Sequence, residues 1–274
     1  MQISRERKLL NLGCGSRIHA DWVNLDFRFP FPMNNPLLIK LACSAGLISA
    51  GKRDLLLNLS RSFIGYNLNK NKPLPFPADY FTAVYSSHLL EHLEYYKALK
   101  VISESFRVLQ PGGIIRIALP DLEELAREYL EQYNKLKEAV DVELKAGWVD
   151  YDRAVTFLLD QMVRCDFWGR MKEFQPEEYS QMIKKGSAKG PLLKLYRRLA
   201  IWRRGFKSWG ELHKWMYDRV SMRYHLLQAG FTDIRECSAV ESRIEGFTDY
   251  YLDTNTDGTV YKADSFYMEG MKPL

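Results

Sequence analysis

The stretch LLNLGCGSRIHADWVNLD, residues 9–26, decides the fold. Its apolar start is typical of a strand buried inside a parallel sheet. Gly13 and Gly15 follow, and because glycine has no Cβ, a ligand can lie directly against their backbone. A second short strand then ends at Asp26, whose carboxylate can accept hydrogen bonds from a ribose diol. This order predicts a nucleotide site in an open α/β sheet.

The glycine turn departs from the dinucleotide-binding fingerprint at one position. Arg17 stands where that fingerprint has its third glycine. Only ten residues separate Gly15 from Asp26, so a helix between the first two strands must be very short. The turn is therefore weak evidence by itself, and the segments that follow decide the prediction.

A second strand-and-helix unit is predicted from residues 74–93, LPFPADYFTAVYSSHLLEHL. The prolines force an extended entry, and FTAVY then forms a short strand. Residues 94–109 carry apolar side chains at helical spacing, and the sequence Pro-Gly-Gly at 111–113 is expected to stop that helix and turn the chain. Residues 114–121, IIRIALPD, then form another buried strand whose acidic end lies at the ligand-binding edge of the sheet.

These segments, in this order, resemble class I S-adenosylmethionine-dependent methyltransferases. The resemblance rests on LNLGCG, VNLD, LPFPADYFTAVYSSHLLEHL and FRVLQPGGIIRIALPDLE, and the stretch from His213 to Glu236 is similar to the family's final helix and strand. It implies a Rossmann-like α/β fold with a doubly wound, mostly parallel, seven-stranded sheet and a helical insertion. It also implies an enzyme whose cofactor is S-adenosylmethionine and whose product is S-adenosylhomocysteine.

A segment in the middle of the chain indicates a narrower class of methyl acceptor. Residues 158–171, LLDQMVRCDFWGRM, resemble a methyltransferase subgroup associated with surface-polysaccharide and glycolipid gene clusters. That resemblance implies O-methylation of a sugar hydroxyl, with a sugar or lipid-linked glycan as the acceptor.

The resemblance also implies a set of cofactor-binding residues. Two of them depart from the family pattern: Asn11 stands where Asp or Glu is usual, and Asn67 replaces a carboxylate that commonly meets the adenine side. An asparagine oxygen can still accept a hydrogen bond from an amino group. The expected cofactor-binding residues are Asn11, Gly13, Cys14, Gly15, Asp26, Asn67, Leu68, Ser87 and His88.

Three residues are candidates for the chemistry of transfer: His88, His213 and Asp121. Methyl transfer mainly needs alignment and exclusion of water, but a hydroxyl or amine acceptor must also lose a proton. A histidine or carboxylate at the strand ends can accept that proton. The alternative for each residue is a role in orienting loops or in contacting the methionine end of the cofactor.

Two other functions are consistent with parts of the sequence. Residues 88–92 match the HxxEH pattern of zinc peptidases, in which two imidazoles one helical turn apart share a metal. The flanking segments all fit the methyltransferase, so we interpret this match as accidental and expect no metal site. The other alternative is a non-catalytic scaffold that keeps the cofactor fold within a polysaccharide assembly.

Composition indicates one large domain with an insertion. The chain has 274 residues, and an apolar fraction of 46% is ample for a core. We expect residues 1–121 and 211–274 to form the cofactor-binding core and residues 122–210 to form a helical cap on the substrate side. Residues 37–50, the most apolar stretch, are expected to form one packed helix between the second and third strands. Four cysteines without CxxC spacing indicate a reducing, cytoplasmic location.

Positive charge is concentrated in residues 184–207, which carry nine lysines and arginines and no acid. A basic amphipathic helix there suits an anionic substrate or a peripheral contact with the inner face of an anionic membrane. The alternative is a solvated helix that packs its apolar stripe on the core. No nucleic-acid-binding module is recognisable, so nucleic acid is not an expected partner.

Overall fold

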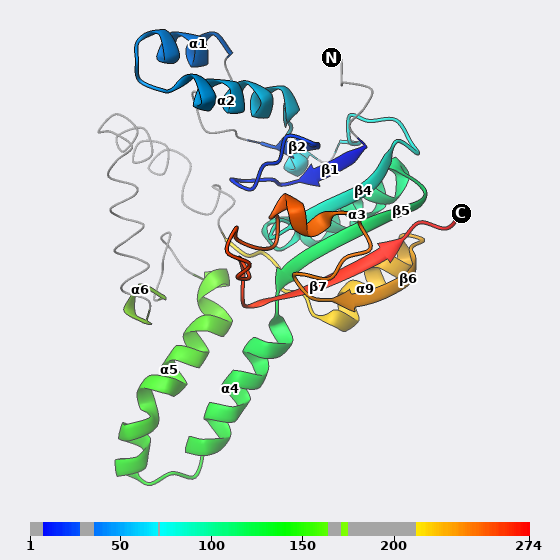
Figure 1. Ribbon diagram of the computed structural model, residues 1–274. Helices are drawn as coiled ribbons and strands as arrows, with labels where there is room; N and C mark the ends of the chain where they lie inside the picture. The colour runs from blue at the N-terminus through cyan, green and yellow to red at the C-terminus, as the bar shows by residue number, and fades with distance from the viewer. Residues whose placement is uncertain (1–7, 28–35, 71, 164–170, 175–211) are drawn as a thin grey trace. The chain divides into compact units, whose positions relative to one another are not determined.

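The computed structural model describes residues 8–27, 36–70, 72–163, 171–174 and 212–274 (Figure 1). The chain divides into two compact units, the first made of Met1–Pro120 with Tyr217–Leu274 and the second of Asp121–Met216. The predicted basic helix at 184–207 and the subgroup-like residues 164–170 lie outside the described residues. In the part of the chain that is described, no helix has the length and apolar character needed to cross a membrane.

The first unit is built on a seven-stranded sheet with the order β3-β2-β1-β4-β5-β7-β6. The first five strands run parallel, and β7 is antiparallel to both β5 and β6. This confirms the predicted Rossmann-like α/β fold. The strands are β1 (Leu9–Leu12), β2 (Trp22–Asp26), β3 (Phe63–Gly65), β4 (Phe81–Ser87), β5 (Leu109–Pro120), β6 (Thr232–Cys237) and β7 (Ser265–Met271).

The centre of the sheet positions the site. Strand β1 lies between β2 and β4, so the chain order reverses there, and the carboxyl ends of β1 and β4 border the crevice in which ligands bind in such sheets. Leu10, Leu12 and Val84 of these strands are fully enclosed. Burial on both faces is the reason that these strands read as continuous apolar runs.

The helices of the first unit are α1 (Pro36–Ser44), α2 (Ala50–Ser62), α3 (Tyr95–Val108) and α9 (Arg219–Gln228). The expected short helix between the first two strands is absent, since residues 13–21 contain turns only. The buried Asn11 amide explains this, because its Nδ2 donates to the Arg17 carbonyl and to Asn24 Oδ1 and so holds the connection in a tight loop.

The single packed helix expected at residues 37–50 is wrong in two respects. The structure has two helices, because Gly46 takes a left-handed φ of 69° and ends α1. The amide of Gly46 donates to the Cys43 carbonyl and that of Leu47 to the Ala42 carbonyl, which is a helix-ending pattern. Most of the apolar surface of α1 is also exposed, and only Ile39 is buried.

The Pro-Gly-Gly segment at residues 111–113 is also different from the expected turn. Helix α3 ends at Val108, and β5 begins at once and includes these residues, with a shift of register between Phe81 and Ala83 on β4. Gly112 has a left-handed φ of 76°, and a Cβ on Gly113 would lie 2.8 Å from the Gln110 carbonyl. The glycines therefore allow an irregular strand rather than a reversal of the chain.

The described part of the second unit is helical. It contains α4 (Leu122–Leu136), α5 (Asp141–Val163) and α6 (Met171–Phe174). Helices α4 and α5 pack against each other through aromatic residues, among them Tyr129 and Tyr151. That this unit caps a substrate stays a prediction.

Candidate functional site at the carboxyl ends of β1 and β4

The glycine turn and the predicted ribose carboxylate lie together. Gly13 and Gly15 both have left-handed φ angles, 65° and 50°, and the amide of Gly15 donates to Asp26 Oδ2 at 2.9 Å. A Cβ on Gly13 would meet the Leu89 side chain at 2.8–3.0 Å, so this turn also packs closely on the segment that follows β4. At Gly15 the Gly13 carbonyl oxygen, 4.0 Å away, is the only atom of the described residues near such a Cβ, which leaves room for a ligand among them.

Arg17 has a structural role that explains the missing third glycine. Its guanidinium donates to the carbonyls of Tyr251 and Thr254 at 3.2 Å and to Asn255 Oδ1 at 2.6 Å. It also stacks over the Tyr261 ring, with 3.5 Å between Cζ and the ring centroid. The glycine turn is thus tied to a segment more than 230 residues away in sequence, which local sequence reasoning could not detect.

Two further predicted cofactor residues of the first strand and turn face the interior. Asn11 is buried and its amide is committed to the loop, as described above. Cys14 is also buried, and burial, with a smaller contribution from Asp26, raises the pKa of its thiol well above the ordinary range. These two side chains shape the turn, and a direct contact of either with a cofactor stays a prediction.

The residues after β3 lie next to Asp26. The amide of Tyr66 donates to the Asp26 carbonyl at 2.8 Å, which brings the following Asn67 and Leu68 to the same edge of the sheet. The side-chain oxygen of Asn67 accepts from the Asn69 amide at 3.0 Å, which forms a local turn. Leu68 is partly buried against the core, and its contact with the cofactor stays a prediction.

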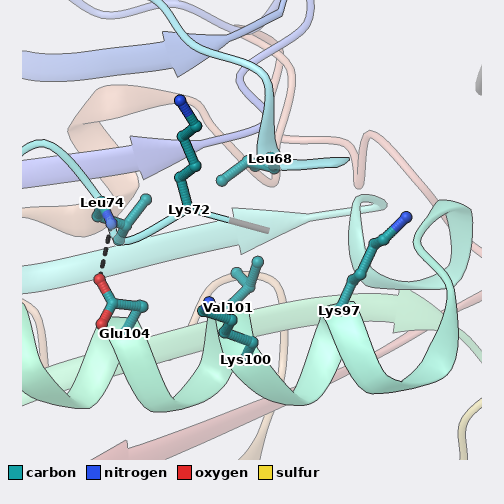
Figure 2. A pocket seen from close by; sticks show the side chains of 7 residues that line it. All are labelled: Leu68, Lys72, Leu74, Lys97, Lys100, Val101 and Glu104. Carbon is teal, nitrogen blue, oxygen red and sulfur yellow. Dashed lines mark hydrogen bonds between the residues drawn. The ribbon is translucent and has the colours of Figure 1, made fainter. Parts of the chain in front are cut away.

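A shallow pocket opens beside Leu68 (Figure 2). Its apolar residues lie among the side chains of three lysines. The Glu104 carboxylate closes one wall by accepting from the Leu74 amide at 2.6 Å. The lining residues are Leu68, Lys72, Leu74, Lys97, Lys100, Val101 and Glu104.

The end of β4 holds the strongest candidate for proton transfer. Ser87 is the last residue of the strand, and His88 follows with a left-handed φ of 47°, an uncommon conformation for a non-glycine residue that is concentrated at functional sites. The His88 Nε2 lies 2.8 Å from Ser265 Oγ at the start of β7. Its Nδ1 lies 3.3 Å from Glu91 Oε1, whose side chain has no exposed surface.

The surroundings of His88 fit a tautomer with its proton on Nδ1, because the Glu91 carboxylate lies 3.3 Å from that nitrogen, at ion-pair distance. In that tautomer the lone pair of Nε2 accepts the hydrogen bond of the Ser265 hydroxyl. An imidazole oriented by a buried carboxylate, with a basic nitrogen toward a hydroxyl group, is the arrangement expected of a general base. The sequence indicated His88 but gave no signal for Ser265.

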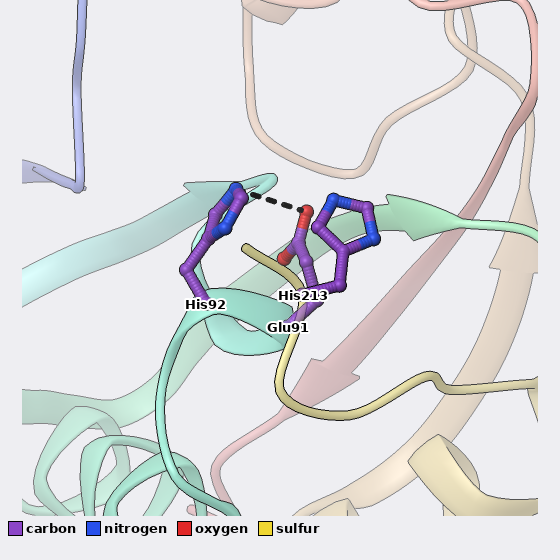
Figure 3. A group of neighbouring side chains, drawn as sticks. All are labelled: Glu91, His92 and His213. Atoms are coloured by element: carbon purple, nitrogen blue, oxygen red, sulfur yellow. Dashed lines mark ion pairs between the residues drawn. The ribbon is translucent and has the colours of Figure 1, made fainter. Parts of the chain in front are cut away.

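The zinc-peptidase interpretation of residues 88–92 is not compatible with the backbone. It needs one α-helix that carries both imidazoles, whereas His88 lies outside any helix and Leu90–His92 form a single 3₁₀ turn. The Glu91 Oε1 lies 3.3 Å from His88 Nδ1 and 3.9 Å from His92 Nε2, and Figure 3 shows the second of these ion pairs. Glu91, the glutamate of the pattern, therefore forms ion pairs with the imidazoles of His88 and His92 just after β4.

Asp121 and His213, the other predicted catalytic residues, belong to the second unit. Asp121 follows β5 directly, but its Oδ1 caps α4 by accepting from the amides of Glu123 and Glu124 at 3.1 and 3.3 Å. His213 is buried, with Nδ1 3.4 Å from Met216 Sδ. The structure thus brings together the site residues of the first unit, and the roles of Asp121 and His213 stay predictions.

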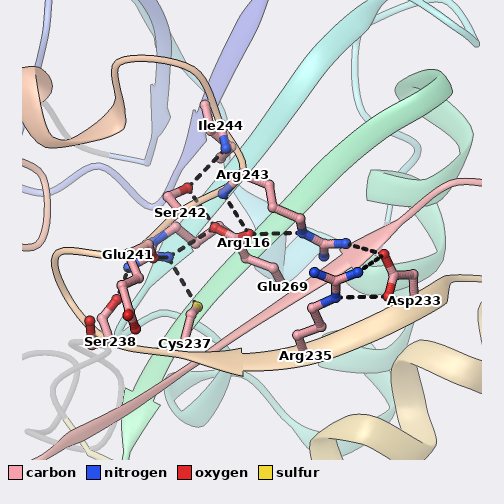
Figure 4. Close-up of polar contacts among 10 residues, drawn as sticks. All are labelled: Arg116, Asp233, Arg235, Cys237, Ser238, Glu241, Ser242, Arg243, Ile244 and Glu269. Carbon is pink, nitrogen blue, oxygen red and sulfur yellow. Dashed lines mark hydrogen bonds and ion pairs between the residues drawn. The ribbon is translucent and has the colours of Figure 1, made fainter.

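A buried ionic network supports the sheet behind this site (Figure 4). The guanidinium of Arg116, on β5, has no exposed surface and pairs with Glu269 at 2.9 Å and with Asp253 at 2.8 Å. It also donates to the carbonyls of Ser238 and Glu241. The network fixes the segment between β6 and β7, which carries the Arg17 contacts.

The chain was compared with family models, curated proteins and solved structures. The family model described as a methyltransferase domain matches residues 39–117, a range that begins in α1 and ends in β5, after the glycine turn. No match was found among curated proteins. Similar solved structures include an S-adenosylmethionine-dependent methyltransferase from Methanosarcina mazei, with 14% identity, a TM-score of 0.40 and coverage of 99% of this chain and 95% of that one. Another, from Archaeoglobus fulgidus, has 12% identity, a TM-score of 0.39 and coverage of 97% and 86%.

The methyltransferase-domain match lies within the first unit. It supports the enzyme class and the S-adenosylmethionine cofactor that the sequence resemblance implied.

Proposed function

We propose that this methyltransferase methylates a hydroxyl group of a sugar in a glycolipid or polysaccharide acceptor. The observation that carries the proposal is His88, whose Nε2 lies 2.8 Å from a hydroxyl group while Glu91 holds its Nδ1 side. A hydroxyl is a weak nucleophile until its proton is removed, so a poised base indicates this class of acceptor. The narrower choice of a sugar is supported by the sequence resemblance of residues 158–171 alone.

The residues of the first unit fit the cofactor. Gly15 offers backbone with free space above it, and Asp26 lies at the rim of the same turn, where a carboxylate can bind a ribose diol. Leu68 provides an apolar contact on the adenine side. When bound, S-adenosylmethionine supplies a methyl group on a positively charged sulfur that leaves as a neutral thioether.

The chain's own contribution is then alignment and proton transfer. The acceptor hydroxyl takes the place of the Ser265 hydroxyl as the hydrogen-bond donor to His88 Nε2, and the proton moves to that nitrogen as the new C–O bond forms. The imidazolium that results has Glu91 beside it, and a buried carboxylate stabilises this charge more strongly than an exposed one. His88 is therefore the catalytic base and Glu91 its positioning residue.

Transfer of a labelled methyl group tests the proposal directly. Cells that lack the protein are extracted, and their glycolipid and polysaccharide fractions are incubated with purified enzyme and S-adenosylmethionine labelled in the methyl group. We expect label in one of these fractions. His88→Ala should lower the rate by about 10²–10⁴-fold, the usual contribution of a general base. Affinity for the cofactor, measured in parallel, should change little.

Three results would contradict the proposal in different ways. Label only in protein or nucleic acid would remove the sugar acceptor. An unchanged rate for His88→Ala on a labelled glycan would remove the base. Binding of the cofactor without transfer to any fraction would favour the non-catalytic scaffold instead.

A further inference from the structure

The helix between β2 and β3 exposes apolar side chains on the face that a globular protein normally makes polar. Leu37 and Leu41, one turn apart on α1, are 64% and 53% exposed, and Leu47, just after the helix, is 77% exposed. The opposite side of α1 buries Ile39. The helix is therefore apolar on its inner and its outer side, and burial in the protein accounts for the inner side only.

The sequence of α1 and α2 is net basic. Residues 36–62 carry Lys40, Lys52, Arg53 and Arg61 against one acid, Asp54, which pairs with Arg53 at 2.8 Å. Lys40 lies within α1 and is exposed. An apolar surface in a net basic segment is complementary to a layer of anionic headgroups over hydrocarbon.

The length of α1 determines whether it can span a bilayer or only lie at its surface. Nine residues of α1 extend about 14 Å at 1.5 Å per residue, less than half of the roughly 30 Å hydrocarbon core of a bilayer. The helix cannot cross a membrane, but it can lie in the plane of the interface. Its leucines then enter the acyl region, and the long stem of a lysine lets the ammonium reach the phosphates.

We propose that α1 and the turn after it, residues 36–48, dock this protein on the surface of a bilayer that contains anionic lipids. We call these residues the docking helix. The proposal does not depend on the acceptor or on the base at His88. Docking through this helix also differs from a contact through residues 184–207, because it depends on the exposed side chains of Leu37, Leu41 and Leu47.

Sedimentation with vesicles tests the docking helix. The full-length protein is mixed with vesicles of phosphatidylcholine alone or with 30% phosphatidylglycerol (roughly a bacterial or inner-leaflet anionic fraction). The test variant carries Leu37→Gln, Leu41→Gln and Leu47→Gln, which remove three exposed leucines without a large loss of helix propensity. The matched control carries Val220→Gln and Leu227→Gln, which remove exposed apolar residues of α9. Cofactor binding verifies that each variant is folded.

We expect the wild type and the α9 control to bind the anionic vesicles equally and the leucine variant to bind more than tenfold more weakly. Lys40→Gln with Lys52→Gln should reduce the preference for anionic over neutral vesicles. The proposal is overturned if the leucine variant binds as the wild type does, if the wild type binds neither type of vesicle, or if the only effect of the leucine variant is to turn a dimer into a monomer in sedimentation velocity. The last result would show that a second copy covers this surface.

Discussion

At the scale of single residues, two carboxylates, Asp26 and Glu91, orient the groups next to them. Asp26 accepts from the Gly15 amide and so holds the turn on which the cofactor is expected to lie. Glu91 has no exposed surface and lies 3.3 Å from His88 Nδ1 and 3.9 Å from His92 Nε2. The Glu91 carboxylate interacts more strongly in this setting than it would on the surface, because water does not screen its charge.

Glu91→Gln tests the orientation of His88. Glutamine keeps the shape of the side chain, but it lacks the charge and can also donate a hydrogen bond. Loss of a charge-assisted contact costs roughly 1.5–3 kcal/mol, so transfer should slow by about 10–150-fold while cofactor affinity stays the same. The ¹⁵N resonances of His88 should shift away from the Nδ1–H tautomer. An unchanged tautomer with unchanged turnover would leave Glu91 without a role in positioning.

The cysteines should differ in their reaction with iodoacetamide at pH 8. Burial raises the pKa of Cys237 to about 11, more than the neighbouring Arg116 lowers it, and burial raises that of Cys14 further. Because the thiolate is the reactive form, both should be alkylated slowly in the native protein. Cys43 is only partly buried and should react first. Peptide mass spectrometry measures the three rates, and equal rates for Cys14 and Cys43 would contradict the structure.

At this scale, the sequence predicted contacts between residues that are close along the chain and not those between distant residues. Gly13, Gly15 and Asp26 lie within one short stretch, so their spacing alone predicted the turn that the structure shows. The hydrogen-bond partners of Arg17, and Ser265 as the partner of His88 Nε2, lie 177 or more residues away, and no local pattern indicates them. The HxxEH match was interpreted as accidental from its flanking segments, since the residue pattern itself does not show that His88 adopts a left-handed φ.

At the scale of elements, Arg17 connects the glycine turn to the segment before β7. Arg17→Ala removes three hydrogen bonds, each worth about 0.5–1.5 kcal/mol. We expect faster hydrogen exchange at the amides of residues 251–261 and a modest loss of cofactor affinity. Arg17→Lys keeps the charge but not the planar fork, so it should behave like the alanine variant. Exchange rates equal to those of the wild type would show that the segment is held by other contacts.

The network around Arg116 should make stability depend on pH in a defined direction. Burial alone would raise the pKa of Glu269, but hydrogen bonds from Ser242, Arg243 and Arg116 hold it below its usual value. A carboxylate with a lowered pKa stabilises the fold above its unfolded pKa of about 4.3, and this contribution is lost as the pH falls through the lower, folded value.

Glu269→Gln should therefore reduce the free energy of unfolding by about 3 kcal/mol at pH 7, the lower end of the cost of breaking a buried ion pair. The difference from the wild type should shrink below about pH 4, where Glu269 itself becomes protonated. Urea unfolding at several pH values measures this. Glu236→Gln, at an exposed carboxylate on the neighbouring β6, is the control. A difference that stays constant as the pH falls would contradict the assignment.

The strands and helices that are most buried were the easiest to predict from the sequence. The strands β1, β4 and β5 are buried, so their apolar runs were readable in the sequence. The split into α1 and α2 was missed because it depends on one left-handed glycine, Gly46. The start of β5 was missed because turn-forming residues at 111–113 fit a bulged strand when a neighbouring strand pairs with it.

At the scale of the whole molecule, one unit holds the complete sheet and the other is inserted after Pro120. The glycine turn, Asp26, His88 and Ser265 all belong to the unit with the sheet. Cofactor binding should therefore depend on this unit alone, whereas the choice of acceptor is expected to need the inserted unit. The central claim is that S-adenosylmethionine binds at the glycine turn beside Asp26.

Calorimetric titration with S-adenosylmethionine tests this claim most directly. Asp26→Ala removes the ribose contact and should weaken binding by about 10–150-fold, corresponding to roughly 1.5–3 kcal/mol for a charge-assisted hydrogen bond. Gly15→Val places a branched side chain at a φ of 50° over the expected cofactor surface and should weaken binding at least as much. Glu236→Ala, on the far edge strand β6, should bind as the wild type does. Affinities of Asp26→Ala and Gly15→Val equal to that of the wild type would contradict the account.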